Sequence, residues 1–162
     1  MNLALPFSEA ISLATAEKPL PAVLRSVDCR GETLHAEIDL EAIPIGSFAL
    51  RLAAAAAGTV TVTARLAGYT DGVATFVVTA HAWNLPAHKL LPFLLEPVNK
   101  AIRDSGLPDG LIRIERGDDD PLVLIDVQQA VETKASGVTV TSLQLLDAVL
   151  HAEATIGTVT LH

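Results

Sequence analysis

Residues 59–83 read TVTVTARLAGYTDGVATFVVTAHAW, and this stretch decides the fold. From Thr59 to Leu66, apolar residues alternate with threonine and arginine, which is the period of a strand with one covered face. Asp71-Gly72 then supplies a dipeptide that favours a tight hairpin turn. The run from Val73 to Trp83 continues as a second long strand. The stretch therefore predicts an antiparallel hairpin, the basic unit of a strand-rich protein.

The same kind of signal recurs on both sides of this hairpin. Three further hairpins are predicted, at residues 22–29 with 33–40, 111–116 with 121–127, and 138–145 with 148–156. Residues 121–127 are apolar on both faces, which favours an interior strand. Residues 48–56 are ambiguous, because their alanine run has helix propensity while their leucines alternate like a strand.

One long amphipathic helix is predicted at about 86–105. Its apolar stripe recurs at the helical period and consists of Leu91, Leu94, Leu95, Val98, Ala101 and Ile102. Pro86 suits a first helical turn and Gly106 a helix end. We expect an α+β fold in which this helix packs on one mainly antiparallel, curled sheet. Residues 1–162 form a single predicted domain, with a short helix in segment 1–21 and a short helix or turn at 128–134.

Charge and composition exclude several classes of function. The net charge is −8, from 11 basic and 19 acidic residues, and the basic residues are scattered along the chain. Such a chain repels phosphate backbones and anionic membrane surfaces, so we expect no nucleic-acid partner. No apolar stretch is long enough to span a bilayer, which predicts no integral membrane association. We expect no cofactor, because no phosphate-cradling loop or related motif is present.

The cysteine content limits the possible crosslinks, and the first residues bear on location. Cys29 is the single cysteine, so an intrachain disulfide and a multi-thiolate zinc site are both excluded. The segment from Met1 to Pro6 has no basic region followed by a long apolar run, and it does not resemble a signal peptide. These features predict a cytoplasmic protein.

Two sets of residues are candidates for a metal site. Asp118, Asp119, Asp120 and Asp126 offer the carboxylate oxygens that Ca²⁺ and Mg²⁺ prefer. Their spacing is not that of an EF-hand loop, and the alternative is an acidic solvated turn ahead of Pro121. His35 and His151 lie on the polar faces of predicted strands, beside Glu37 and Glu153. Together they could form a zinc or acid–base site, or they are ordinary exposed polar residues. Both histidines belong to the tetrapeptide Leu-His-Ala-Glu, which occurs at 34–37 and again at 150–153 and raises the question of a structural repeat.

Apolar residues gather at the junction between the long strand and the helix. They are Trp83, Leu85, Leu90, Phe93 and Leu94, and they are the candidate ligand-binding residues. Ordinary core packing is the alternative for the whole group, because burying a leucine contributes about 1.5–3 kcal/mol against either a ligand or the core.

Two strand segments resemble the tubular lipid-binding family, the group of lipid-transfer and bactericidal permeability proteins. They are Gly72-Val73-Ala74-Thr75-Phe76-Val77-Val78 and Gly137-Val138-Thr139-Val140-Thr141-Ser142-Leu143. The resemblance, over about residues 22–157, implies a curled sheet around a long helix and a lipid-like ligand. It implies no catalytic residues.

Three functions remain open after this survey of the sequence. The first is non-enzymatic binding of an apolar or lipid-like ligand in a groove between sheet and helix. The second is an assembly protein that acts as a homodimer, since strands apolar on both faces need cover. The third is an enzyme built on histidines and carboxylates, which has the least support because no catalytic motif is present.

Overall fold

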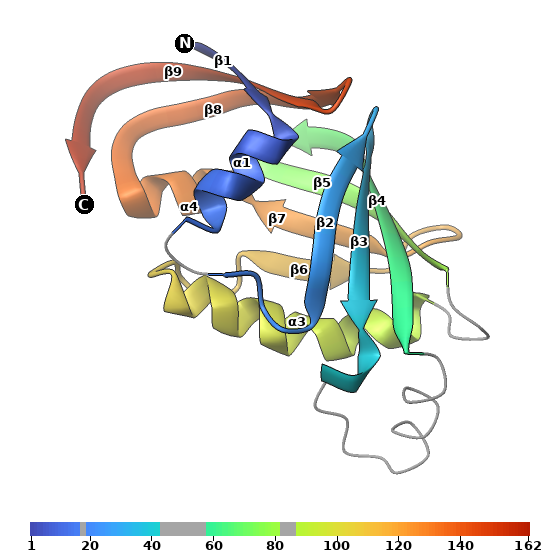
Figure 1. Ribbon diagram of the computed structural model, residues 1–162. Helices are drawn as coiled ribbons and strands as arrows, with labels where there is room; N and C mark the ends of the chain where they lie inside the picture. Colours follow the sequence, from blue (N-terminus) through green and yellow to red (C-terminus); the bar gives the residue numbers. More distant parts are fainter. Residues whose placement is uncertain (17–18, 43–57, 82–86) are drawn as a thin grey trace.

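The computed structural model describes residues 1–16, 19–42, 58–81 and 87–162 (Figure 1). The described strands are β1 (Asn2–Pro6), β2 (Leu24–Arg30), β3 (Thr33–Asp39), β4 (Thr59–Thr70), β5 (Val73–His81), β6 (Ile112–Glu115), β7 (Leu122–Asp126), β8 (Ala135–Leu146) and β9 (Val149–Leu161). The described helices are α1 (Phe7–Ala14), the short 3₁₀ helix η1 (Leu40–Ala42), α3 (Ala87–Asp104) and α4 (Val127–Lys134). The ambiguous segment 48–56 lies outside the described residues.

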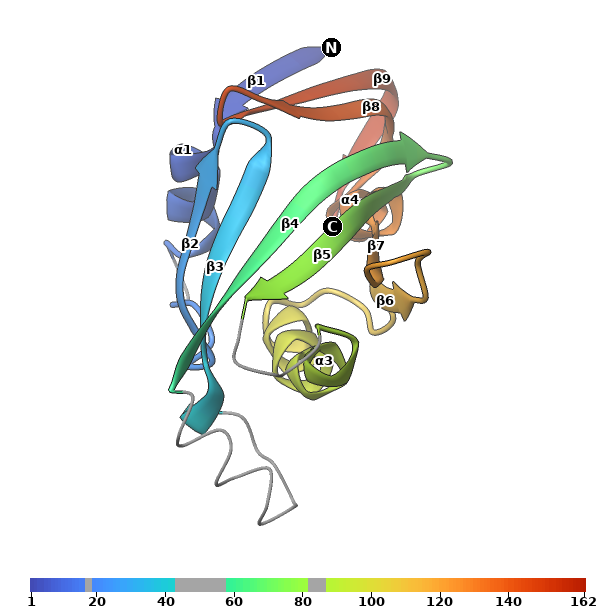
Figure 2. The same cartoon turned by 90° about the vertical axis from the view of Figure 1, so that its right-hand side faces the viewer.

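The described strands form two antiparallel sheets. One has six strands in the order β2-β3-β4-β5-β7-β6, and the other has three in the order β1-β9-β8. Helix α3 lies on one side of the six-stranded sheet, and β8 and β9 lie at the opposite end of the molecule (Figures 1 and 2). The two sheets meet where β4 runs close to β8.

The expected architecture of one curled sheet carrying one long amphipathic helix is wrong. The strands are divided between two sheets, and helical residues are divided among α1, α3 and α4. The strand β1 was not expected, and it pairs Asn2–Pro6 with residues 149–153 of β9. A pairing between segments so distant in the chain leaves no mark in local periodicity, which reports only what each segment does with its own neighbours.

The hairpins and their turns follow the local sequence closely. The predicted pairs appear as β2–β3, β4–β5, β6–β7 and β8–β9. In β4–β5 the turn residues Asp71 and Gly72 have φ of 51° and 83°, as a two-residue hairpin turn of the predicted kind requires. β4 extends beyond the predicted end at Leu66, because a bulge between Leu66 and Gly68 lets pairing resume as far as Thr70. The interior position of β7, between β5 and β6, is also confirmed.

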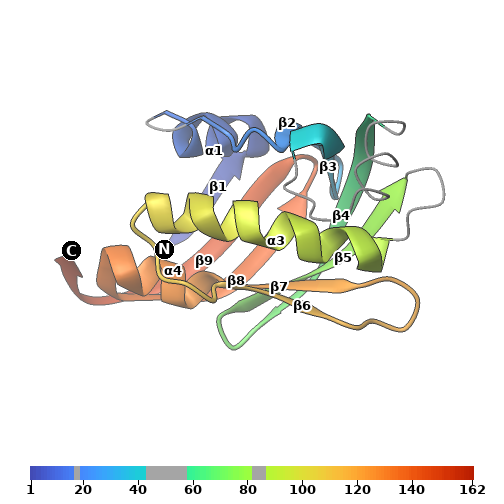
Figure 3. The same ribbon diagram turned by 90° about the horizontal axis from the view of Figure 1, so that it is seen from below.

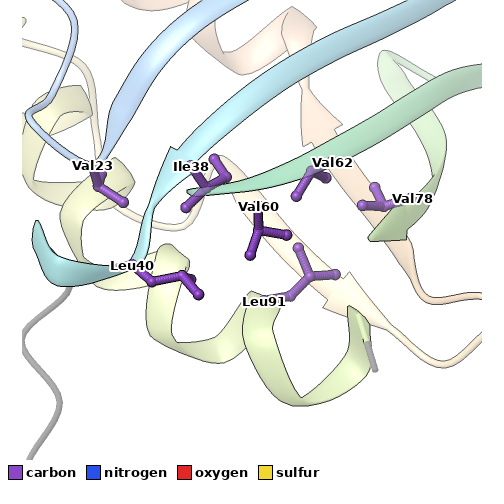
Figure 4. Close-up of a cluster of buried hydrophobic side chains, with 7 residues drawn as sticks. All are labelled: Val23, Ile38, Leu40, Val60, Val62, Val78 and Leu91. Carbon is purple, nitrogen blue, oxygen red and sulfur yellow. The ribbon is translucent and has the colours of Figure 1, made fainter. Parts of the chain in front are cut away.

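The core lies between the six-stranded sheet and α3 (Figure 4). Its buried cluster consists of Val23, Ile38, Leu40, Val60, Val62, Val78 and Leu91. Ile38 and Leu40 are each 2% exposed, which confirms the predicted inward face of residues 33–40. Leu91 is the member that α3 contributes, so the helix closes this layer of aliphatic side chains. Burying each such side chain contributes about 1.5–3 kcal/mol.

Helix α3 ends in a turn that holds its last residues in place. The N–H of Ser105 bonds to the carbonyl of Ala101 at 3.1 Å, and the N–H of Gly106 bonds to that of Arg103 at 2.9 Å. Gly106 has φ of 76°, the left-handed conformation that commonly ends a helix and that favours glycine. The side chain of Arg103 also reaches Glu96 and Asp109, at 3.2 and 3.1 Å. Backbone hydrogen bonds and the two ion pairs of Arg103 therefore hold the end of α3 in place.

Candidate functional site

A pocket of about 530 Å³ lies between the end of α3 and the segment that joins α1 to β2. Figure 3 shows α3 running alongside that part of the chain. The lining residues come from α1 and its end (Ala14, Thr15), from the joining segment (Pro19, Leu20, Pro21, Ala22, Val23), from η1 (Ala42) and from α3 and its end (Lys100, Ala101, Asp104, Ser105). Most of them are small or apolar, so the pocket is shaped by backbone and methyl groups more than by charged side chains.

One backbone hydrogen bond closes a turn in the joining segment, and a second ties the segment to the end of β3. The N–H of Leu24 bonds to the carbonyl of Pro21 at 2.9 Å, and the N–H of Asp39 bonds to that of Val23 at 2.8 Å. Pro19 and Pro21 prevent a helix from continuing here, and the chain instead makes a turn at Ala22 and Val23 before β2. Val23 is 2% exposed and belongs to both the core cluster and the pocket lining. The floor of the pocket is therefore the edge of the hydrophobic core.

The polar side chains that line the pocket already have partners within their own helices. The hydroxyl of Thr15 donates to the carbonyl of Ile11 at 2.8 Å. The hydroxyl of Ser105 donates to the carbonyl of Ala101 at 2.9 Å. Lys100 Nζ lies 3.0 Å from an oxygen of Asp104, so the cation in this lining is paired with a carboxylate. The pocket thus suits a neutral apolar molecule better than an anion that would need an unpaired positive charge.

Three of the five predicted ligand-binding residues, Leu90, Phe93 and Leu94, belong to the first half of α3, whereas the pocket is lined by residues at the end of that helix. Trp83 and Leu85 lie outside the described residues, and the side chains of Leu90, Phe93 and Leu94 are outside them as well. Their ligand-binding role stays a prediction. Local sequence does not indicate this pocket, because Pro19 and Pro21 show only that a helix cannot continue there. The signal that could have found it was Leu20 and Val23, apolar residues in a stretch too rich in proline to form its own core element.

The candidate metal-binding residues are dispersed. His35 lies in β3 between β2 and β4, whereas His151 lies in β9 between β1 and β8, so the two belong to different sheets. Asp126 caps α4 by accepting the N–H of Gln129 at 2.9 Å, which gives it a structural role. The described residues contain no group of three or more His, Cys, Asp and Glu side chains that could hold a metal ion. Asp118, Asp119 and Asp120 lie in the loop between β6 and β7.

The repeated tetrapeptide occupies equivalent places in two hairpins. Leu34 and Leu150 are each the second residue after a two-residue turn, at Gly31-Glu32 and at Asp147-Ala148. The two turns touch, because the N–H of Ala148 bonds to the carbonyl of Gly31 at 2.8 Å. The hairpins otherwise belong to different sheets, so the similarity is confined to position within the hairpin.

Tyr69 and Gln128 hold the two sheets together. The hydroxyl of Tyr69 donates to the carbonyl of Val140 in β8 at 3.2 Å. Burial, and then the negative charge of Asp126, raise the pKa of this phenol. Gln128 bonds to the backbone of Val138 and Val140. Two smaller hollows, of about 340 and 320 Å³, both have Tyr69 in their lining. This junction is polar and hydrogen-bonded, and its role is structural.

Cys29 does not have the environment of an activated nucleophile. It is half-buried in β2, and its sulfur lies 3.6 Å from the carbonyl oxygen of Gly31. Burial, and then the nearby charge of Asp28, raise the pKa of the thiol. Reactive cysteines have a lowered pKa, because the thiolate is the nucleophile. The raised pKa disfavours the thiolate form, so the structure does not support Cys29 as a nucleophile.

Among the described residues, no helix has the length and apolar character needed to cross a bilayer.

Comparison with known proteins gives this chain no family. No family model, no curated protein and no solved structure matches it. The resemblance to the tubular lipid-binding proteins stays a prediction, and the function must be argued from the pocket itself.

Proposed function

We propose that this protein binds a small, neutral, apolar molecule in the pocket between α3 and the segment that joins α1 to β2, without catalysing a reaction. The observation that carries the proposal is the pocket's combination of size and lining. Its volume of about 530 Å³ lies within the range of roughly 300–1,000 Å³ typical of ligand sites. Small-molecule sites are mostly apolar with few polar groups, and this lining has that character.

The chemistry of the lining restricts the class of ligand. Lys100 is paired with Asp104, and the hydroxyls of Thr15 and Ser105 donate to carbonyls of their own helices. A charged ligand would have to displace these partners, and a strongly polar one would lose its hydration without replacement. A ligand with an apolar body and at most a hydroxyl group, such as a fatty alcohol, meets neither cost.

The proposal is tested by filling the pocket. Ala101 lines it from α3 and is half-buried, so Ala101→Phe places an aromatic ring in the space that the ligand would occupy. Ala130→Phe is the matched control, because Ala130 is also a half-buried helical alanine, in α4 and away from the pocket. The probe is N-phenyl-1-naphthylamine, a neutral apolar dye whose fluorescence rises when it leaves water.

We expect saturable dye binding by the wild type and by Ala130→Phe, with an affinity at least about tenfold lower for Ala101→Phe. A fatty alcohol should displace the dye more effectively than the fatty acid of the same length, because the lysine that lines the pocket is already paired with Asp104. Circular dichroism and thermal melting must show that both variants fold. Equal binding by the two variants, or no saturable binding by the wild type, would refute the proposal.

A further inference from the structure

The second half of β9 is a strand edge that no other described strand covers. β9 lies between β1 and β8, but β1 pairs only with residues 149–153. The last bonds on that side join Met1 and Ala154, at 2.7 and 2.8 Å. Beyond Ala154 the strand pairs with β8 alone among the described residues, at 155–156 and at 160–161 with a bulge between them, and it curves away beyond β1 (Figure 1). Its second row of N–H and C=O groups can therefore accept another strand.

The side chains of this stretch suit strand pairing. Every residue from Thr155 to His162 is exposed, including Ile156 at 52% and Leu161 at 79%. The sequence from 155 to 161 reads TIGTVTL, with five β-branched residues, no proline and no charge. β-Branched residues are enriched in strands, and an exposed, uncharged apolar edge is a template for a further strand.

The other described edges carry the features that discourage such pairing. β2 has Arg25, Asp28 and Arg30, the short β6 has Arg113 and Glu115, and β1 ends in Pro6. The outer side of β8 is occupied at Val138 and Val140 by the side chain of Gln128. Charges, proline and covering side chains are the usual means by which proteins protect a sheet edge. Within the described part of the chain, the second half of β9 has none of these protections.

We propose that this stretch of β9 pairs antiparallel with the same stretch of a second copy, about a two-fold axis. Two identical edges related by such an axis are self-complementary, because each N–H of one copy can meet a C=O of the other. The charge of −8 opposes contact between two copies over much of the surface, and an uncharged strand is where this repulsion is weakest. An axis at Thr158, the middle of this stretch, sets Thr155 opposite Leu161 of the second copy, so the contact stays within the uncharged residues.

The contact joins the two three-stranded sheets into one continuous sheet. A single strand per copy is much smaller than the roughly 20–30 residues per side of a stable interface. The dimer therefore dissociates on dilution. This inference uses no residue of the ligand pocket, so it stands or fails independently of the proposed function.

Sedimentation velocity, run on the full chain from about 10 µM to about 1 mM, tests the assembly in the range expected for a small interface. The wild type should shift from monomer towards dimer as its concentration rises. Val159→Lys places like charges on facing strands and should weaken dimerisation at least about tenfold. Leu13→Lys is the control, because it makes the same charge change at a residue of α1 that is 68% exposed. It should leave the dimer intact.

Cysteine crosslinking locates the contact. In a Cys29→Ser background, single cysteines are placed in turn at each position from 155 to 161. Directly opposed residues of an antiparallel pair have Cα atoms about 4.5–5.5 Å apart, within the range that a disulfide can bridge. One position, with Thr158→Cys the first candidate, should form a symmetric disulfide dimer far faster than Ser8→Cys on α1. A strict monomer at all concentrations, a dimer unaffected by Val159→Lys, or crosslinking that does not depend on position would each overturn the proposal.

Discussion

The side chain of Gln128 joins α4 to β8, and replacing it with alanine should loosen the junction of the two sheets. Its Nε2 donates to the carbonyl of Val138 at 3.0 Å, and its Oε1 accepts the N–H of Val140 at 2.9 Å. Nε2 also lies 2.8 Å from Glu132 within α4. Gln128→Ala therefore leaves one backbone donor and one backbone acceptor of β8 without their partner in a partly buried place.

The expected loss follows from these contacts. An intramolecular hydrogen bond contributes about 0.5–1.5 kcal/mol net, so the two bonds to β8 contribute about 1–3 kcal/mol. The bond to exposed Glu132 adds little, because a side-chain pair at this spacing on a helix is worth only a few tenths of a kcal/mol. In a chain of this size each kcal/mol lowers the melting temperature by about 2–4 °C. A loss of about 2 kcal/mol therefore lowers it by about 4–8 °C.

The matched control is the neighbouring residue. Gln129→Ala makes the same substitution in the same helix, but Gln129 is exposed and its backbone N–H, which bonds to Asp126, is unchanged. Urea denaturation should show a loss for Gln128→Ala and almost none for Gln129→Ala. Amide hydrogen exchange should accelerate at Val140 in the first variant only. Equal stabilities, or unchanged protection at Val140, would show that this side chain does not hold the sheets together.

Two further predictions concern Gly72 and Cys29. Gly72 has φ of 83°, and a Cβ there would lie 2.6 Å from the Cβ of Gln128, whereas Gly110 has φ of 80° and no atom within 4 Å. Both alanine variants carry the same backbone strain, and only the one at Gly72 also crowds Gln128. In urea denaturation, Gly72→Ala should therefore lower the free energy of unfolding by about 1–3 kcal/mol more than Gly110→Ala does. Equal losses would contradict the close approach of Gln128 to Gly72. The pKa of Cys29 is raised above its ordinary 9.0, first by burial and then by Asp28, so the folded chain holds this proton more tightly than the unfolded chain. The stability that this tighter proton binding contributes is fully present below about pH 9 and is lost as pH rises through the folded-state pKa. Cys29→Ser removes the thiol, so this variant should lose less stability than the wild type between about pH 8 and pH 11. Parallel pH profiles of the two proteins would refute this.

Local sequence predicted the hairpins because their determinants are local. Asp71-Gly72 adopts positive φ and turns the chain by itself, and the alternation in residues 33–40 places Ile38 and Leu40 towards the core. The short helices at 7–14 and 127–134 also fall where the sequence predicted helix. In each case the residues that determine the element are neighbours in the chain.

The candidate site was only partly visible in the sequence. Ala101 belongs to the predicted apolar stripe of the helix, but the sequence suggested a ligand site around Trp83 and Phe93, and neither residue lines the pocket. The pocket is formed when residues 19–23 come to lie beside residues 100–105. Nothing in either segment specifies the other, because small apolar residues and prolines pack against many partners equally well.

The sequence by itself determined the turns, the hairpins, the inward faces of the strands and the strand-rich character of this protein. Only the tertiary structure decided that β1 pairs with β9, that the strands divide into two sheets, and which edge stays open after Ala154. The physical reason is that backbone N–H and C=O groups are the same in every residue. A strand's period therefore tells which face is buried, whereas the choice of neighbour depends on how the whole chain packs.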